Sequence, residues 1–106
     1  MVDSLDSVLK ERLRAVLDRE PVTEGELRKL IEEGRACALL VRGQLESSER
    51  RLTELSGDPE AALADIAEAL REVHVLRPSL DELQAMLGEL QGRAREFRRS
   101  WVAPGA

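Results

Sequence analysis

The sequence predicts an all-α fold, an elongated antiparallel hairpin or bundle of about three to four helices with coiled-coil-like heptad seams. Apolar residues make up 42% of the 106 residues but aromatic residues only 2%, so leucine supplies most of the apolar surface. Apolar residues also recur at alternating three- and four-residue spacings, which is typical of packed helices. Proline and glycine separate these stretches. We expect helices at about 3–19, 23–55, 59–77 and 79–101, in one domain (1–102) followed by a disordered tail (103–106).

The first two predicted helices differ in length. The first carries a leucine at every fourth position from Leu5 to Leu17 and ends before Pro21. The second opens at a capping box, Thr23 to Glu26. It then repeats apolar or small residues over about four heptads. These seam positions are Leu27, Ile31, Gly34, Ala38, Val41, Leu45, Ser48, Leu52 and Leu55.

The apolar stripe of the second helix changes width along its length. Leu30 and Cys37 widen the stripe in the first half, whereas the second half has only the narrow seam. A wide stripe needs two partner helices and a narrow seam needs one. We therefore expect three helices side by side at one end of the molecule and two at the other.

The stretch SGDPE, residues 56–60, predicts the turn between the second and third helices. Gly57 is suited to end a helix in the left-handed conformation, Asp58 to cap the next helix, and Pro59 to occupy its first turn. The third segment then places apolar residues on one face. They are Leu63, Ile66, Leu70 and Val73.

Pro78 leaves two architectures open. Proline disfavours a helical residue before it, and Ser79 to Glu82 forms a second capping box. The fourth segment has its own seam, which is out of phase by one residue with the third: Leu80, Leu83, Leu87, Leu90, Ala94, Phe97 and Trp101. The slip favours a turn into a fourth antiparallel helix over a single kinked helix. A single helix from residue 58 to 101 would outrun the second helix by about eleven residues, roughly 16 Å.

Charge and composition limit the classes of partner that the chain is expected to bind. The net charge of −5 argues against nucleic acid as a partner, because phosphate binding needs a basic excess. Residues 58–91 hold eight acids and two arginines, whereas residues 93–106 hold four arginines and one glutamate. These opposite charges can pair in an antiparallel assembly. The acidic N-terminus and the short apolar runs predict a soluble, intracellular, cytoplasmic protein without a membrane partner.

Residues that could carry chemistry are few, so we predict no enzyme, catalytic residue, metal or cofactor, and no small-molecule substrate is evident. His74 is the single histidine, and the valines on either side of it argue against a phosphotransfer site. Glu72 precedes it by two residues rather than the three that a di-metal bundle site needs. Cys37 is the single cysteine, for which we expect a buried thiol. Glycine-rich phosphate loops and nucleophile elbows are also missing from the sequence.

The favoured function is that of a protein–protein interaction module, a helical scaffold, adaptor or subunit that forms a homo-oligomer or joins a hetero-complex. Consecutive seam residues Gly34 and Ala38 form a shallow notch for a bulky side chain, and Phe97 with Trp101 forms an aromatic anchor at the end of the last helix. The candidate partner-binding residues are Leu87, Leu90, Phe97, Trp101, Gly34, Ala38, Leu45 and Leu52.

The alternative is a small nucleic-acid-binding or regulatory protein that uses its basic C-terminal helix. Arg95, Arg98 and Arg99 share an arc of about 100° on that helix, a small contact for phosphates. Gly88 and Gly92 lie four residues apart on the face away from the leucine seam. Another backbone could approach the helix closely there.

Overall fold

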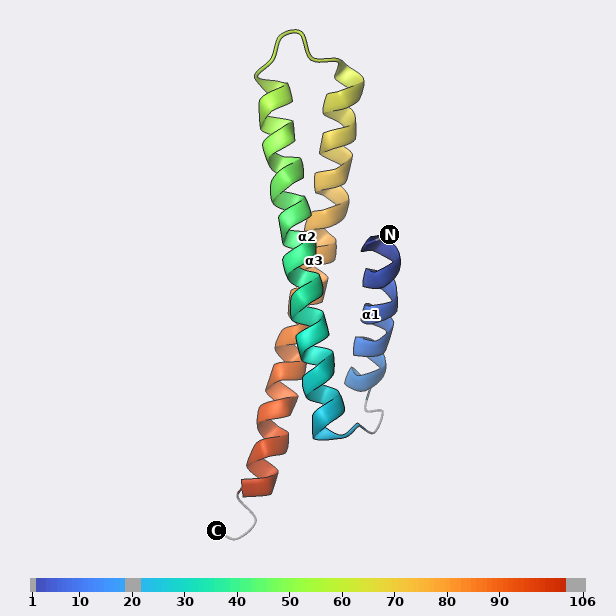
Figure 1. Cartoon of the computed structure of the whole chain (residues 1–106), viewed down its shortest axis with the longest axis vertical. Helices are drawn as coiled ribbons and strands as arrows, with labels where there is room; N and C mark the ends of the chain where they lie inside the picture. Colours follow the sequence, from blue (N-terminus) through green and yellow to red (C-terminus); the bar gives the residue numbers. More distant parts are fainter. Residues whose placement is uncertain (1, 19–21, 103–106) are drawn as a thin grey trace.

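The fold is all-helical in the computed structural model, which describes residues 2–18 and 22–102 and side chains over 7–18 and 22–99. It contains α1 (Val2–Leu17), α2 (Glu24–Ser56) and α3 (Leu63–Val102). Helices α2 and α3 form a long antiparallel hairpin that α1 flanks at the end away from the turn (Figure 1). The molecule measures 70 × 24 × 17 Å, and its radius of gyration is 18.6 Å. A compact domain of this length has a radius of gyration of roughly 13 Å, so the shape is a rod.

The ends of α2 follow the sequence signals in part. The Thr23 hydroxyl accepts a hydrogen bond from the backbone N–H of Glu26 at 3.1 Å, as the capping box predicts. Gly57 is the C-cap of α2, as predicted, but its φ of −87° lies in the right-handed region and not in the predicted left-handed one. The Asp58 carboxylate accepts from the N–H of Glu60 at 2.9 Å within the connection. It therefore caps a local turn, and α3 begins at Leu63 rather than at residue 59.

Pro78 lies inside α3, which runs unbroken through it, so the predicted helices 59–77 and 79–101 are one helix. The reason is the position of Ala69, which is completely buried, whereas Leu70 is 44% exposed. With Ala69 and Leu76 in the seam, the three–four alternation passes through Pro78 without a slip. This continuous seam is Ile66, Ala69, Val73, Leu76, Leu80, Leu83, Leu87, Leu90, Ala94 and Phe97.

The register of the hairpin is fixed by contacts at both ends. Gly34 packs directly against Leu87. Nearer the turn, the Ser48 hydroxyl donates to the Glu72 carboxylate at 2.9 Å, and Arg77 pairs with Glu49 at 2.7 Å. The two helices are therefore held at two levels, and at one of them a small residue, Gly34, faces a large one, Leu87.

The overhang of α3 is shorter than the single-helix alternative predicted. Arg98 lies 3.7 Å from Glu24, the first residue of α2, so only about four residues of α3, or 6 Å, extend further. The predicted overhang of eleven residues is wrong mainly because α3 starts later than residue 58.

Helix α1 supplies the expected third helix at one end. Its residues Leu9, Leu13 and Val16 are buried in the same core as Leu30 and Cys37 of α2. The wide stripe on the first half of α2 thus has two partner helices, as predicted. Above the N-terminus of α1 the hairpin has only two helices (Figure 1).

Polar contacts fasten α1 to α3. The ammonium group of Lys10, a side chain that is only 9% exposed, donates to the Ser79 hydroxyl at 2.8 Å and lies 3.4 Å from the Glu82 carboxylate. Arg14 also donates to Glu82. Ser79 and Glu82 therefore bind α1 instead of capping a fourth helix. At the other end of α1, Arg93 donates to the carbonyl of Val16 at 2.8 Å, where a helix C-terminus favours positive charge.

The Glu82 contacts predict a loss of stability in acid. The hydrogen bond from Arg14, followed by the charge of Lys10, lowers the pKa of Glu82 below its ordinary value of 4.5. A lowered pKa in the folded state stabilises the fold above the unfolded-state pKa, and this stabilisation is lost as the pH falls through the folded-state pKa. We expect Glu82→Gln to lower the urea midpoint at pH 7, and the difference from the wild type to close below about pH 4.

Measuring both proteins at each pH isolates this effect, because all other carboxyl groups are common to them. A difference in urea midpoint that stays constant from pH 7 to pH 3 would contradict the assignment.

Candidate interaction surface

The seam residues proposed for partner binding lie inside the hairpin. Leu45, Leu87 and Leu90 are buried, and Ala38 and Leu52 are partly buried against the same core. The notch at Gly34 is filled by Leu87 of the same chain. The structure thus brings these residues together between α2 and α3, where they hold the two helices against each other.

The two aromatic residues lie near the end of α3. Phe97 follows Ala94 in the seam and its side chain is 37% exposed. The backbone of Trp101 belongs to α3, but its side chain lies outside the described residues. The predicted aromatic anchor therefore has one described member, which lies close to the level of the first turn of α2.

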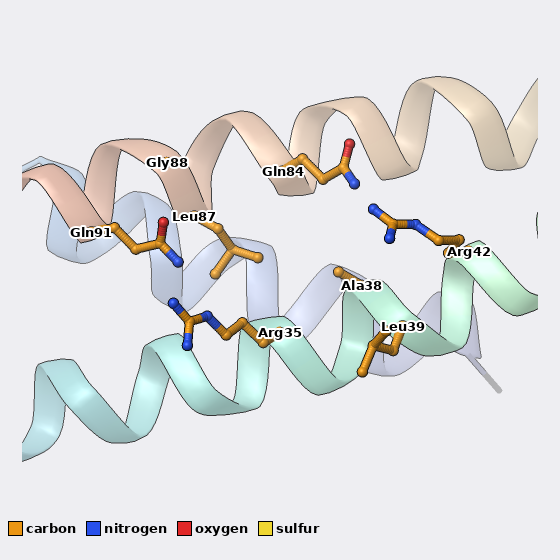
Figure 2. Close-up of a pocket in the computed structure, with 8 residues that line it drawn as sticks. All are labelled: Arg35, Ala38, Leu39, Arg42, Gln84, Leu87, Gly88 and Gln91. Carbon is orange, nitrogen blue, oxygen red and sulfur yellow. The ribbon is translucent and has the colours of Figure 1, made fainter.

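An arginine-lined groove runs between α2 and α3 on the side of the hairpin opposite α1. It consists of two adjoining hollows of about 370 and 300 Å³ that share Arg35 and Gln91. Figure 2 shows the first hollow, with side chains from both helices around Leu87. We call the two hollows together the arginine groove, whose lining residues are Arg28, Ile31, Glu32, Arg35, Ala38, Leu39, Arg42, Gln84, Leu87, Gly88, Gln91, Arg95 and Arg98.

The groove is basic at its sides and partly apolar at its floor. Among the residues that the structure describes, its lining contains five arginines and one carboxylate, Glu32. The Arg35 guanidinium faces the side-chain amide of Gln91 (Figure 2). Turning that amide over, so that its oxygen faces the guanidinium, lets Arg35 donate to it from Nε at 3.1 Å and from Nη2 at 2.8 Å. Leu39 is 66% exposed at the edge of the groove. Such a surface suits an acidic partner that also carries apolar side chains.

Two of the three arginines predicted for a basic contact line this groove. Arg95 and Arg98 do so, whereas Arg99 is exposed but is not among the lining residues. Sequence reasoning missed the α2 arginines, Arg28, Arg35 and Arg42. Their signal is a spacing of seven residues beside the seam, which keeps them on one side of a helix that follows a heptad repeat.

The glycine pair on α3 leaves open space. A Cβ atom added at Gly88 or at Gly92 would meet no other atom within 4 Å. Gly88 lines the arginine groove, so the helix backbone is directly accessible there. The predicted close approach of another backbone is sterically open at this position.

The remaining candidates for chemistry stand apart from one another. His74 is exposed on α3 and Cys37 is buried on α2, as expected for the thiol. Within the described ranges, His, Cys, Asp and Glu residues do not gather into a group that could hold a metal ion. The described helices also lack a segment long and apolar enough to cross a membrane.

Comparison with known proteins adds no further assignment. No protein-family model, curated protein or solved structure matches this chain. The functional argument therefore starts from the geometry of the rod, its open groove and its exposed leucines.

Proposed function

We propose that this chain is a non-enzymatic protein–protein interaction module, a helical scaffold, adaptor or subunit that self-associates or joins a larger complex. The observation that carries the proposal is that α1 covers the hairpin on one side only. Helix α1 packs on one side, over the half of the hairpin away from the turn, and the opposite side presents the arginine groove (Figure 1). Exposed apolar side chains flank this open surface, notably Leu39 and, nearer the turn, Leu70.

Seams of alternating three- and four-residue spacing support this proposal. The same type of packing that joins α2 to α3 also joins helices of separate chains in coiled coils and bundles. The leucine seam fixes the hairpin, and the partner meets its exposed flanks and the aromatic end near Phe97.

Sedimentation velocity and light scattering test the proposal directly. We expect the full chain to be larger than a monomer at high micromolar concentration, or to form a stoichiometric complex with another purified protein. A chain that stays a monomer at the highest soluble concentration and binds no other protein would contradict it.

The arginine groove also favours a second candidate, binding of nucleic acid by the basic C-terminal helix. Arg28 and Arg35 of α2 add to the charge that Arg95 and Arg98 provide. Glu24 lies 3.9 Å from Arg28 and 3.7 Å from Arg98, which offsets part of that charge. Titration with single- and double-stranded oligonucleotides at low salt tests this candidate, since phosphate contacts give affinity that falls steeply with salt. Absence of binding at low salt excludes it.

A further inference from the structure

We propose that the occupant of the arginine groove is the turn end of a second copy of this chain, in an antiparallel dimer with two-fold symmetry. This inference rests on the proposed function and specifies its partner and its surface. Each hairpin contributes the same side, the one opposite α1, so that every contact occurs twice and the assembly closes.

The first argument is that exposed leucines near the turn share a side of α3 with the groove. Leu63 is 83% exposed and Leu70 is 44% exposed. From Leu70 the heptad leads through Arg77 to Gln84, which lines the groove. The seam stays continuous over this length, so residues seven apart remain on the same side. Leu63 and Leu70, which we call the tip leucines, therefore lie in line with the groove.

The second argument is the position of the opposite charges around the proposed symmetry axis. The axis crosses the hairpin between Arg42 and Glu46 on α2, and at the level of Ser79 on α3. Two-fold rotation then brings Arg42 level with Glu46 of the second copy. On α3 it brings Arg77 level with Asp81 of the second copy. Arg42, Glu46, Arg77 and Asp81 are all exposed.

Both pairings agree with the register of the hairpin. The Gly34–Leu87 contact places the axis level of α2 beside residue 77 of α3, and the Arg35–Gln91 contact places it beside residue 82, so the level of Ser79 lies between the two. One rotation therefore satisfies both helices at once. Opposite charges that meet twice about an axis select this alignment over shifted ones.

The third argument is steric. The same rotation places Leu70 of one chain at the level of Gly88 of the other. A Cβ atom at Gly88 would have no neighbour within 4 Å, so this position accepts a side chain from outside. Leu63 comes level with Arg95, whose aliphatic stem can cover it while the guanidinium stays in water. The dimer thus covers both tip leucines.

The fourth argument concerns the connection after α2. Its residues Asp58 and Glu60 are exposed, and the rotation carries this connection toward the N-terminal end of α2 in the second copy, where Arg28 lies. The acidic turn of each hairpin meets the basic end of the other. Helix α1 of a second copy fits the groove less well than the acidic turn does. Its Lys10 and Arg14 bind the acidic Glu82, and in the groove they would place positive charge against the arginines.

Disulfide cross-linking tests the alignment. In the full chain with Cys37→Ala, we introduce Leu70→Cys together with Gly88→Cys. The two positions are about 27 Å apart along α3, so a bond within one chain is impossible. Mild oxidation is expected to give a covalent dimer. The matched control pairs Leu70→Cys with Glu89→Cys, which lies one residue further and about 100° around the helix from Gly88, and should stay largely unlinked.

A second pair of variants tests the tip leucines without a cross-link. Leu70→Lys is expected to raise the dissociation constant of the dimer about tenfold or more, because a cation then lies against the arginines of the groove in the second copy. Val75→Lys should leave it unchanged, since Val75 is 62% exposed and lies one heptad before Glu82, which binds α1. Circular dichroism checks that both variants remain helical.

The outcomes separate the inference from the proposed function. A dimer that cross-links equally through residues 88 and 89, or that tolerates Leu70→Lys, overturns the inference but leaves an interaction module. The same holds if the chain is a monomer that binds another protein. A monomer that neither cross-links nor binds any protein overturns both.

Discussion

Replacing Pro78 with alanine is expected to raise the free energy of unfolding by about 2 kcal/mol. A proline inside a helix costs about 3 kcal/mol relative to alanine, because it removes one backbone hydrogen bond and its ring clashes with the preceding turn. Part of this gain is offset, by up to about 1 kcal/mol, since alanine leaves the unfolded chain more freedom. Pro78 lies on the exposed side of α3, so the change removes little packing.

The sign of this effect discriminates between the two architectures. If α3 ended at Pro78 in a turn, alanine would lower stability, because it would remove a residue preorganised for that turn. Pro59→Ala is the matched control, since Pro59 lies exposed in the connection between α2 and α3. It should lower the free energy of unfolding by about 0.4–1 kcal/mol. Urea unfolding followed by circular dichroism measures both variants, and a less stable Pro78→Ala protein would contradict an unbroken α3.

Proline and capping signals predicted a turn that the structure does not have, because packing outweighs them. Ser79 and Glu82 look like a helix start in the sequence, but in the fold they bind Lys10 of α1. The apparent slip of register came from assigning Leu70 to the seam. The buried position is Ala69, a small residue that is completely buried, whereas Leu70 is exposed. Hydrophobicity alone favours leucine over alanine, so only the continuous three–four spacing through Ala69 could have revealed the single helix.

The length of α2, its cap and the three-helix end were predictable, since each depends on local spacing. The arginine groove depends instead on which residues of two distant segments meet. Arg28 and Arg35 face Gln91 and Arg98 only in one antiparallel register, and that register follows from the contact between Gly34 and Leu87. The sequence predicted a break at Pro78, so it did not predict which residues of α2 the second half of α3 contacts. The groove therefore could not be assembled from the sequence.

Replacing Gly34 with leucine is expected to lower the free energy of unfolding by about 2 kcal/mol. Even a single added Cβ atom at Gly34 overlaps the Leu87 side chain and lies 3.3 Å from Leu87 Cγ. Leu87 is 6% exposed, so a second large side chain has to displace it or separate α2 from α3. Overpacking of this kind costs about 1–3 kcal/mol, occasionally more, and outweighs the gain of about 1 kcal/mol from replacing glycine in a helix.

Gly43→Leu is the matched control, because Gly43 lies in the same helix with no atom within 4 Å of an added Cβ. There only the helix propensity changes, and stability should rise by about 0.5–1 kcal/mol. Combining Gly34→Leu with Leu87→Ala should recover part of the loss, since the second change makes room for the first. A positive coupling of about 1–3 kcal/mol in this double-mutant cycle confirms that the two residues oppose each other. Equal effects of leucine at Gly34 and at Gly43 would instead place Gly34 outside the hairpin seam.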